Sequence, residues 1–472
     1  VAANVAADAA TNSNTAASQL SVTTDGTAPT VALTGPTEVV TTDFRMTFAF
    51  SEPVTGLTAD DVTVVNGTKG ALTGSGTTYT LAITPELGTT VSVSVPANSA
   101  VDSAGNGNEA SNTFEVSAGS PASEFEAAKP EVTQAITASA ERTLNSAIVS
   151  NTRLVRDARS RFLASRQQMQ GDTAGIASRN TVAFDVDGTA EFTGLTLSTK
   201  GTFFGQTGDF EGTKRRLVFG DFNLQRDSET GSNTATLSGK IAWEQMLSEQ
   251  TMLGYYIGGE LGRSQIEGSF TGDQDQLGVS AGGYVVHALQ ENLFVDGFVS
   301  LGIGQNDLEM SNATLDLESD YGTKTATVGA ALTGVIEQDG YNLLPELSFT
   351  YGKTFLGDVA FTGRAYGLVD NTLSLDAGDV STATLMFRPE FSFALDGQEV
   401  STSLSTLSFA PRLICEQRKV GAKTSDNCGG GAELGMISST ADGLSSATIK
   451  LLADRVGNST RSGLQLQFEH KF

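Results

Sequence analysis

The feature that most constrains this chain is a long alternation of apolar and polar side chains in its C-terminal half. Residues 341–355, 381–395 and 460–472 each place apolar residues on one face of an extended strand and polar residues on the other. Strands of soluble sandwiches are usually shorter than these segments. A strand needs roughly 9–11 residues to cross a bilayer at a tilt. The sequence therefore predicts membrane-crossing strands, which must close into a barrel so that every backbone group is paired in lipid.

Loop lengths give an independent indication of a barrel. The twelve expected strands given below are numbered here in chain order. The connections after even-numbered strands are short, and those after odd-numbered strands are longer, the longest being residues 357–380. The connection after strand 11 is an exception because it is also short. Short periplasmic turns and longer extracellular loops are typical of outer-membrane barrels. Residues 171–214 fit no pattern well and are expected to be a connecting segment, a polar hairpin or one extra strand. The expected strands number twelve and lie approximately at 215–228, 234–247, 251–266, 275–289, 293–310, 323–338, 341–356, 381–395, 402–417, 430–440, 444–457 and 460–472.

The N-terminus contains part of a repeat. Val1–Val22 aligns with Val95–Val116 at a shift of 94 residues, with 10 of 22 positions identical and no gap. A fixed period of this size indicates tandem domains rather than a solenoid. We expect residues 1–24 to be the truncated end of a preceding domain, so that the chain is the C-terminal piece of a longer array.

Residues 25–118 read as one complete β-sandwich domain. Six short expected strands, at 30–33, 44–50, 61–66, 78–83, 91–95 and 112–116, are separated by turn residues. Three motifs, DGTAPTVAL (25–33), FSEPVTGLTADDVTV (50–64) and DSAGN (102–106), resemble the bacterial Ig-like repeats of large surface adhesins. Some such repeats bind calcium near their junctions, so the resemblance makes Asp25, Asp61 and Asp102 candidate oxygen ligands. The alternative is that these aspartates only cap turns.

A helix is expected between the two β regions. Residues 119–130 form a small-residue linker with two prolines, whereas residues 131–170 contain neither Gly nor Pro. Leu144, Ile148, Val155 and Phe162 form a thin apolar helical stripe. The second half of this segment is basic, which fits a solvated helix, a short coiled coil, a basic linker or a helix inside an acidic cavity. Its basic residues are Arg153, Arg156, Arg159, Arg161 and Arg166.

The C-terminal region resembles the translocator barrel of type V autotransporters. The resemblance rests on residues 239–264, on residues 323–353 and on the closing GLQLQFEHKF (463–472). The order of Ig-like passenger, helix and C-terminal barrel (215–472) also fits. The family implies that the Arg-rich helix threads the lumen, where Arg–carboxylate pairs would hold it. The candidate acidic partners on polar strand faces are Glu244, Glu260, Asp296, Glu346 and Glu390.

Other features invite narrower hypotheses. Cys415 and Cys428 flank the expected outward loop after strand 9, where they form either a disulfide in an oxidising compartment or two free thiols. Phe468 and Phe472 end the last amphipathic strand, as in the C-terminal assembly signal of outer-membrane proteins. Asn151 can be compared with the paired asparagines at which some autotransporters cut inside the barrel, but no Asn-Asn pair occurs here.

Composition narrows the function. The formal net charge of −25 disfavours nucleic acid as a partner. No nucleophile elbow, zinc-protease helix or phosphate loop is present, so no catalytic residue is expected. The expected fold is all-β with one long helix: an Ig-like sandwich, a luminal helix and a 12-stranded antiparallel transmembrane barrel. We expect no cofactor except the calcium considered above.

The expected function is that of an outer-membrane autotransporter which anchors, helps export and displays an Ig-like passenger for adhesion or biofilm formation. Its expected partners are outer-membrane lipid, the barrel assembly machinery and an unknown surface ligand. The alternative is a plugged outer-membrane pore with an accessory extracellular Ig-like domain. Tandem repeats and a basic helix ahead of the barrel favour the autotransporter.

Overall fold

The computed structural model describes residues 1–169, 183–193, 196–211, 214–227, 231–395, 403–440 and 445–471. The chain divides into two compact units, Val1–Ser123 and Glu124–Phe472, which are considered separately. Among the described residues, no helix is both long enough and apolar enough to cross a membrane.

The first unit contains a β-sandwich made of two three-stranded sheets. One sheet has the order β1-β2-β4 and the other β3-β5-β6, and all the pairings within them are antiparallel. The six strands that the sequence predicts are present, although β4 starts earlier than expected, at Gly67. The strands are β1 (Val31–Thr34), β2 (Phe44–Val54), β3 (Thr63–Val65), β4 (Gly67–Pro85), β5 (Thr89–Ser94) and β6 (Phe114–Ala118).

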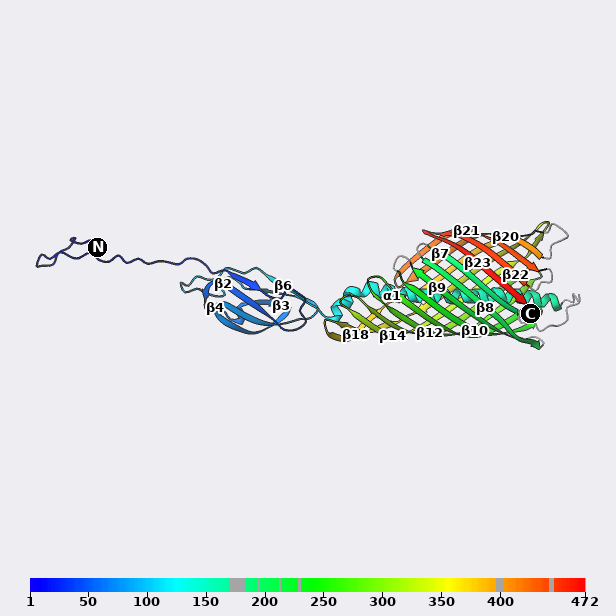
Figure 1. Ribbon diagram of the computed structural model, residues 1–472, viewed down its shortest axis with the longest axis horizontal. Coiled ribbons are helices and arrows are strands. Elements are labelled where there is room, and N and C mark those ends of the chain that lie inside the picture. Colours follow the sequence, from blue (N-terminus) through cyan, green and yellow to red (C-terminus); the bar gives the residue numbers. More distant parts are fainter. Residues whose placement is uncertain are drawn as a thin grey trace. The chain divides into compact units, whose positions relative to one another are not determined.

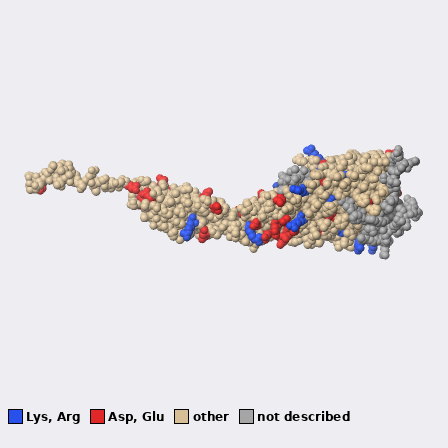
Figure 2. Space-filling view, viewed as in Figure 1, with Lys and Arg blue, Asp and Glu red and all other residues tan. Residues whose placement is uncertain are grey.

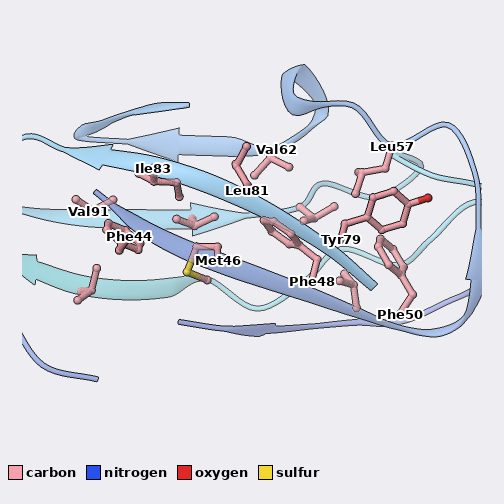
Figure 3. Close-up of a cluster of buried hydrophobic side chains, with 14 of the residues drawn as sticks. Phe44, Met46, Phe48, Phe50, Leu57, Val62, Tyr79, Leu81, Ile83 and Val91 are labelled. Atoms are coloured by element: carbon pink, nitrogen blue, oxygen red, sulfur yellow. The ribbon is translucent and has the colours of Figure 1, made fainter. Parts of the chain in front are cut away.

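The sandwich core is built from the alternating side chains of these strands. Alternate residues of β2 from Phe44 to Phe50 are buried, Met46 and Phe48 completely, and Leu81 and Ile83 of β4 are buried against them (Figure 3). Tyr79 places its hydroxyl in this core and donates a hydrogen bond to the Val54 carbonyl at 2.9 Å. The domain therefore has its own apolar core.

Residues 1–22 adopt the same local turn as residues 95–116, with which they align. Asp8 Oδ1 accepts hydrogen bonds from the backbone N–H groups of Ala10 and Asn12 at 2.9 and 3.0 Å. Asp102 Oδ1 accepts the equivalent pair 94 residues later at 2.8 Å each. Because the same hydrogen bonds form at both positions, the turn geometry follows the local Asp-x-x-x-Asn sequence that the two segments share.

The helix is longer than the sequence predicts. α1 (Pro121–Met169) includes most of the expected linker 119–130, so the predicted boundary at residue 131 is wrong. Ser120 and Ser123 exchange side-chain and backbone hydrogen bonds of 3.0 and 3.1 Å ahead of the first turn, and Pro121 lies where a helix tolerates proline. Pro130 lies inside the helix. The predicted helix end, Gln170, lies outside the described residues.

The second unit is a closed barrel of 14 strands, not 12 (Figure 1). The two additional strands come from residues that we expected to form a connecting segment, and one of them pairs with the last strand to close the barrel. The wall consists of β7 (Ala183–Thr193), β8 (Thr196–Glu211), β9 (Lys214–Asp227), β10 (Asn233–Ser248), β11 (Thr251–Ile266), β12 (Thr271–Gln290), β13 (Leu293–Ser311), β14 (Asp316–Gly334) with the short β15 (Ile336–Gln338), β16 (Tyr341–Phe355), β19 (Val380–Ala394), β20 (Ser403–Val420), β21 (Lys423–Thr440), β22 (Ser445–Val456) and β23 (Ser459–Lys471).

Several predicted long loops are instead strand extensions. β12, β13 and β14 run for 20, 19 and 19 residues, about twice the length needed to cross a bilayer. The predicted loop at residues 357–380 is largely a hairpin of β17 (Asp358–Ala365) and β18 (Leu368–Asp376), which pairs with the start of β14. We call this end of the barrel the hairpin end. The opposite end, where β7 begins and β23 ends, is the terminal end.

The outer face of the barrel is apolar around its middle. Apolar side chains face outward and are exposed on strands all around the barrel, as expected for a wall that contacts lipid. Examples are Ile257, Leu301, Leu347, Leu413 and Leu466, with 45 to 65% of their surface exposed. In Figure 2, charged side chains gather toward the hairpin end, and the middle of the visible wall is largely free of them.

Candidate functional site

The candidate site is the barrel lumen, where α1 packs against the inner face of the wall (Figure 1). One face of α1 is buried, and Leu144, Val155 and Phe162 of the predicted apolar stripe are among its most buried members. At Gly352 of β16, an added Cβ would lie 2.6 Å from Leu144 and 2.8 Å from Ile148. A glycine at this position therefore lets the helix approach the wall closely.

Two helix arginines reach carboxylates of β13 and β16. Arg159 Nη1 lies 2.8 Å from Asp296 Oδ1 and donates to Thr333 Oγ1. The carboxylate of Glu346 forms ion pairs with Arg156 Nη2 at 3.3 Å and with Arg159 Nη2 at 3.7 Å. The side chains of Arg159, Asp296 and Glu346 are each at least nine-tenths buried, so their charges compensate one another away from bulk water.

A third helix arginine binds a carboxylate nearer the terminal end. Arg161 donates two hydrogen bonds to Glu244 of β10, at 2.7 and 3.3 Å. Arg215 of β9 lies 2.6 Å from the same carboxylate, and the Tyr284 hydroxyl donates to it at 2.9 Å. Four polar groups therefore converge on one buried site, with a geometry that suits a guanidinium fork.

Asn151 lies at the centre of a hydrogen-bonded contact between α1 and the wall. It is 2% exposed. Its Oδ1 accepts hydrogen bonds from Lys240 Nζ at 2.9 Å and from the Tyr256 hydroxyl at 2.7 Å, and its amide donates to Thr327 Oγ1 at 3.1 Å. The adjacent Ser150 donates to Asp221 of β9. Asn151 thus touches three strands at once and fixes the rotation of the helix.

Other predicted luminal residues are placed differently. Arg153 lies 4.0 Å from Asp157 one helical turn away, and Arg166 lies over the Phe162 ring of the same helix. Glu390 pairs with Arg388 two residues earlier on β19 at 2.6 Å, not with the helix. Glu260 lines a small polar cavity together with Lys240, and its Oε1 has no hydrogen-bond partner among the described residues. The expectation that these two glutamates bind the helix arginines is wrong.

At the hairpin end, the start of α1 is held by the tips of two hairpins. Glu124 accepts hydrogen bonds from the Tyr366 hydroxyl at 2.7 Å and from Thr314 at 3.2 Å. The Phe125 ring packs against Phe361 of β17 at 5.2 Å between centroids. The start of the helix is therefore held by hydrogen bonds and an apolar contact, whereas its C-terminal half is held by ion pairs.

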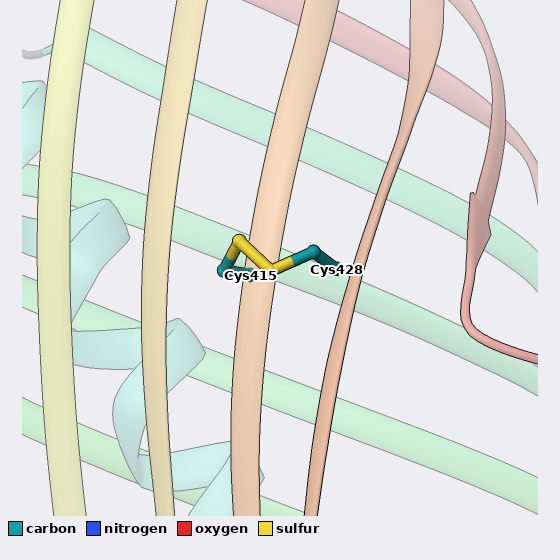
Figure 4. Close-up of a disulfide and its surroundings, with 2 residues drawn as sticks. All are labelled: Cys415 and Cys428. Carbon is teal, nitrogen blue, oxygen red and sulfur yellow. A yellow bond between two sulfur atoms is a disulfide. The ribbon is translucent and has the colours of Figure 1, made fainter.

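Cys415 and Cys428 are joined by a disulfide near the same end (Figure 4). They are directly paired residues of β20 and β21. These strands extend through most of the loop that we expected after strand 9, and only two residues connect them. Phe468 of the predicted assembly signal faces outward and is 52% exposed. Phe472 lies outside the described residues.

The Ig-like unit contains the predicted aspartates in two separate places. Carboxylate oxygens of Asp25, Glu52 and Asp102 lie within 4.8 Å of one another. Burial, followed by the charges of the two aspartates, raises the pKa of Glu52. Asp61 instead accepts hydrogen bonds from the Thr58 hydroxyl at 2.5 Å and the Thr58 N–H at 2.8 Å, which lower its pKa. Asp61 is thus a turn cap outside the acidic cluster.

Sequence reasoning missed several of these residues. Lys240 and Arg215 lie on polar faces of expected strands. A basic helix predicts acidic partners on the wall, so these two basic residues were not among the expected luminal residues. Glu52 lies inside the second Ig-like motif. Its proximity to Asp25 and Asp102 depends on the folded domain, which the motif alone does not reveal. Alternation alone could have identified the two wall residues as inward-facing.

Comparison with known proteins agrees with this arrangement. Residues 25–118 match the family model of the bacterial Ig-like domain, and residues 244–406 match that of the autotransporter β-domain. A comparison with curated protein sequences gave no match.

Solved structures resemble the chain weakly. The β-domain of the Bordetella autotransporter BrkA is 11% identical over 62% of this chain and 100% of its own, with a TM-score of 0.39. The translocator domain of NalP from Neisseria meningitidis is 14% identical over 67% of this chain and 96% of its own, with a TM-score of 0.36. The toluene transporter TodX of Pseudomonas putida is 9% identical over 62% and 89%, with a TM-score of 0.33.

The two family matches stand in the order of the two units, and the second falls on the closed barrel with its apolar outer face. The chain is therefore an outer-membrane autotransporter, with a bacterial Ig-like domain ahead of an autotransporter β-domain.

Proposed function

We propose that this autotransporter anchors in the outer membrane, helps to export the Ig-like domain and holds it on the cell surface, where it serves in adhesion or biofilm formation. The observation that carries this proposal is the direction of α1 inside the barrel. Glu124 is held at the hairpin end, and Arg161 is bound to Glu244 nearer the terminal end.

Chain connectivity then supports the side on which the Ig-like domain emerges. The last strand of that domain ends at Ala118, and Glu124 follows only six residues later. Six residues span at most about 20 Å, less than the roughly 30 Å of a bilayer core. The Ig-like domain thus belongs on the side of the hairpin end, and the family places the chain termini of such barrels in the periplasm.

Export and insertion need no catalytic residue in this proposal. The barrel assembly machinery of the family would insert the barrel into lipid, with Phe468 among the outward aromatic residues of the last strand. The passenger would cross as extended chain, and folding of its buried core outside would oppose its return. The ion pairs of Arg156, Arg159 and Arg161 would then keep α1 as a permanent tether.

An adhesive role is supported by the tandem repeat and by the charge of the exported part. Residues 1–122 contain 11 acidic residues but only Arg45 and Lys69 as bases. Such a surface stays soluble and repels similar surfaces, so contact with a ligand would depend on specific groups or on bridging cations. Nucleic acid is not a suitable ligand for it.

The test combines surface proteolysis with gel mobility of the extracted barrel. Intact cells that make the whole chain are treated with protease, and the membranes are then run on a gel with and without boiling. We expect the Ig-like part to be removed from intact cells while the remaining fragment migrates faster unless it is boiled. Loss of the Ig-like part only after cell lysis would place it in the periplasm and overturn the display proposal.

The adhesive role needs a separate comparison. Cells with the whole chain are compared with cells that carry the same barrel and helix without residues 1–118. We expect attachment and aggregation only with the whole chain, at equal amounts of heat-modifiable barrel. Equal attachment by both cell types would contradict adhesion but leave display intact.

A further inference from the structure

The outer face of the barrel carries two adjoining grooves on β8 to β13. The first, which we call the rim groove, has a volume of about 560 Å³ and lies toward the hairpin end. The second, which we call the middle groove, has a volume of about 580 Å³. On β10, residues 233–235 line the rim groove, whereas Gly239 and Ile241 line the middle groove. Only Leu237 faces outward between them, so the two grooves follow one another along the same strands.

The rim groove contains two arginines from the strands on either side of β10. Arg226 of β9 pairs with Asn233 of β10, and Arg263 of β11 pairs with Ala235, two residues further along β10. These register positions put the two backbone sites roughly 12 Å apart, from two strand spacings and one two-residue step. Both arginines are exposed and face outward. Two side chains of this length can therefore converge on one phosphate group, which guanidinium forks bind well.

The existing partners of these arginines leave them available to an anion. Arg263 lies 3.6 Å from Asp273 and 3.7 Å from Asp275, and more than half of each of these three side chains is exposed. Ion pairs this long and this exposed contribute little to stability. Arg226 forms no ion pair with a described residue. A phosphate that accepts charge-assisted hydrogen bonds from both guanidinium groups would therefore replace only weak contacts.

An aromatic pair toward the other end of the same strands marks the opposite membrane interface. Trp243 of β10 and Tyr255 of β11 face outward and stack at 5.4 Å between ring centroids. Eight residues separate Tyr255 from Arg263. This is about 27 Å along the strand, or about 21 Å along the barrel axis at a tilt of about 40°. The apolar band of an outer-membrane barrel is about 25 Å tall and is flanked by aromatic residues. The two arginines therefore lie at the level of the lipid head groups on the side of the hairpin end.

The middle groove lies within the apolar band and owes its depth to glycine. Gly239 and Gly259 face outward at directly paired positions of β10 and β11. A Cβ added at either position would meet no atom of a neighbouring strand closer than 3.9 Å, so the packing of the wall does not require glycine there. The missing side chains leave a hollow that can hold an acyl chain. Its sides are formed by the outward-facing Ile241, Ile257, Val279, Leu301 and Ile303.

We propose that this wall binds a phosphorylated glycolipid of the outer leaflet. Arg226 and Arg263 hold the phosphate, the exposed amides of Asn233 and Gln265 bind sugar hydroxyls, and the middle groove holds an acyl chain. A lipid held at both places is recognised by two features whose spacing the strands fix. The choice of leaflet rests on the proposed display function, which puts the hairpin end outside the cell, whereas the chemistry of the site does not depend on it.

The first measurement is lipid retention by the whole chain, extracted in detergent and examined by native mass spectrometry. The probe is lipid A, a phosphorylated and acylated glucosamine disaccharide. The comparison lipids are dephosphorylated lipid A and phosphatidylglycerol. We expect the chain to retain lipid A and to bind both comparison lipids roughly tenfold more weakly, because each lacks one of the recognised groups. Equal binding of the dephosphorylated form would overturn recognition of the phosphate, and equal binding of phosphatidylglycerol would overturn recognition of the sugar.

Inorganic phosphate separates a lipid site from a simple anion site. We expect it not to displace lipid A at equal concentration, because it cannot occupy the middle groove. Displacement would overturn the lipid proposal and leave an anion site alone.

The arginines are tested by replacing both with glutamine, which keeps much of the side-chain volume and removes the charge. We expect Arg226→Gln with Arg263→Gln to weaken lipid A binding roughly tenfold or more. Arg455→Gln is the matched control. Arg455 is an exposed residue at the hairpin end of β22 and lines neither groove. Equal affinities of the double variant and the control would overturn the site.

The acyl chain is tested by filling the middle groove. Gly259→Val adds a side chain for which the wall has room, and valine favours a strand, so we expect a heat-modifiable barrel with weaker lipid A binding. Gly239→Val, directly opposite on β10, repeats the test in a second variant. Full affinity in both would overturn the assignment of the groove to an acyl chain.

The binding measurement and the display assay fail independently. Binding is measured in detergent, where the two leaflets no longer exist, whereas proteolysis of intact cells reports only on the side of the Ig-like part. A chain that binds lipid A through the two arginines but keeps the Ig-like part in the periplasm would contradict display and the choice of leaflet, and would support the site.

Discussion

Arg161 of α1 and Glu244 of β10 form a two-point ion pair across the barrel lumen, with N–O distances of 2.7 and 3.3 Å. The Glu244 side chain is fully buried and that of Arg161 is 13% exposed. The guanidinium also stands 5.2 and 5.6 Å from the ring centres of Phe204 and Phe219. This combination of a fork and two aromatic faces suits arginine and not lysine.

Replacing Glu244 by Gln should weaken the barrel considerably. The change leaves Arg161 and Arg215 buried beside each other without their shared anion, which typically costs about 3–5 kcal/mol. We expect a lower temperature for the mobility shift of the extracted barrel. The control is Asp275→Asn, which removes an exposed partner of Arg263 on the outer face and should change stability little. Equal behaviour of the two variants would mean that the luminal ion pair contributes nothing beyond a surface pair.

Asn151 offers a comparison within one helix. Asn151→Leu removes the acceptor for Lys240 and Tyr256, and buried polar groups that lose a partner cost about 1–3 kcal/mol each. Asn145→Leu is the same substitution at an exposed position of α1, six residues earlier. We expect only the first variant to lower the temperature of the gel shift. A similar loss in both would contradict the assignment of Asn151 as the central contact.

Much of the barrel could be predicted from alternation, and the omission of β8 has a specific cause. Residues 196–211 contain the adjacent pair Phe203 and Phe204, which breaks a strict two-residue pattern. Phe203 is exposed on the outer face, whereas Phe204 faces the lumen and packs against Phe219 and Arg161. An aromatic residue can therefore occupy a polar face when it serves a helix cation, and the sequence does not reveal that partner.

The luminal site was predictable in kind but not in detail. Arg156, Arg159 and Arg161 lie near predicted carboxylates because a basic helix and inward acidic residues share one confined space. Which arginine meets which carboxylate depends on helix rotation, which Asn151 and Gly352 set through contacts that have no sequence signature. Glu390 is an example of a wrong pairing: it was expected to bind a helix arginine, but it pairs with Arg388, two residues away on its own strand.

The Asp61 cap predicts an acid sensitivity of the Ig-like domain. Hydrogen bonds from Thr58 lower the pKa of Asp61 below the unfolded value of about 3.9, so the ionised form stabilises the fold. This contribution is complete above the unfolded pKa and is lost as pH falls through the folded pKa. We expect acidification to lower the protection of the amides near residues 58–62 in the whole chain, measured relative to their intrinsic exchange rates at each pH, and Asp61→Asn to reduce that pH dependence. Asp60→Asn is the neighbouring control, and an identical pH dependence in both variants would contradict the cap.

The cluster of Asp25, Glu52 and Asp102 makes the calcium prediction specific. Three close carboxylates are hard oxygen ligands. Burial first, and then the charges of Asp25 and Asp102, raise the pKa of Glu52, and a divalent cation would neutralise these two charges. Calcium at 100 times its dissociation constant would stabilise the domain by about 2.7 kcal/mol. We expect calcium to slow hydrogen exchange across residues 25–118 of the whole chain, and chelator to reverse it. Glu52→Gln should abolish the effect, whereas Asp61→Asn should preserve it, because Asp61 lies outside the cluster. If calcium changes nothing in the unaltered chain, the three carboxylates do not form a calcium site.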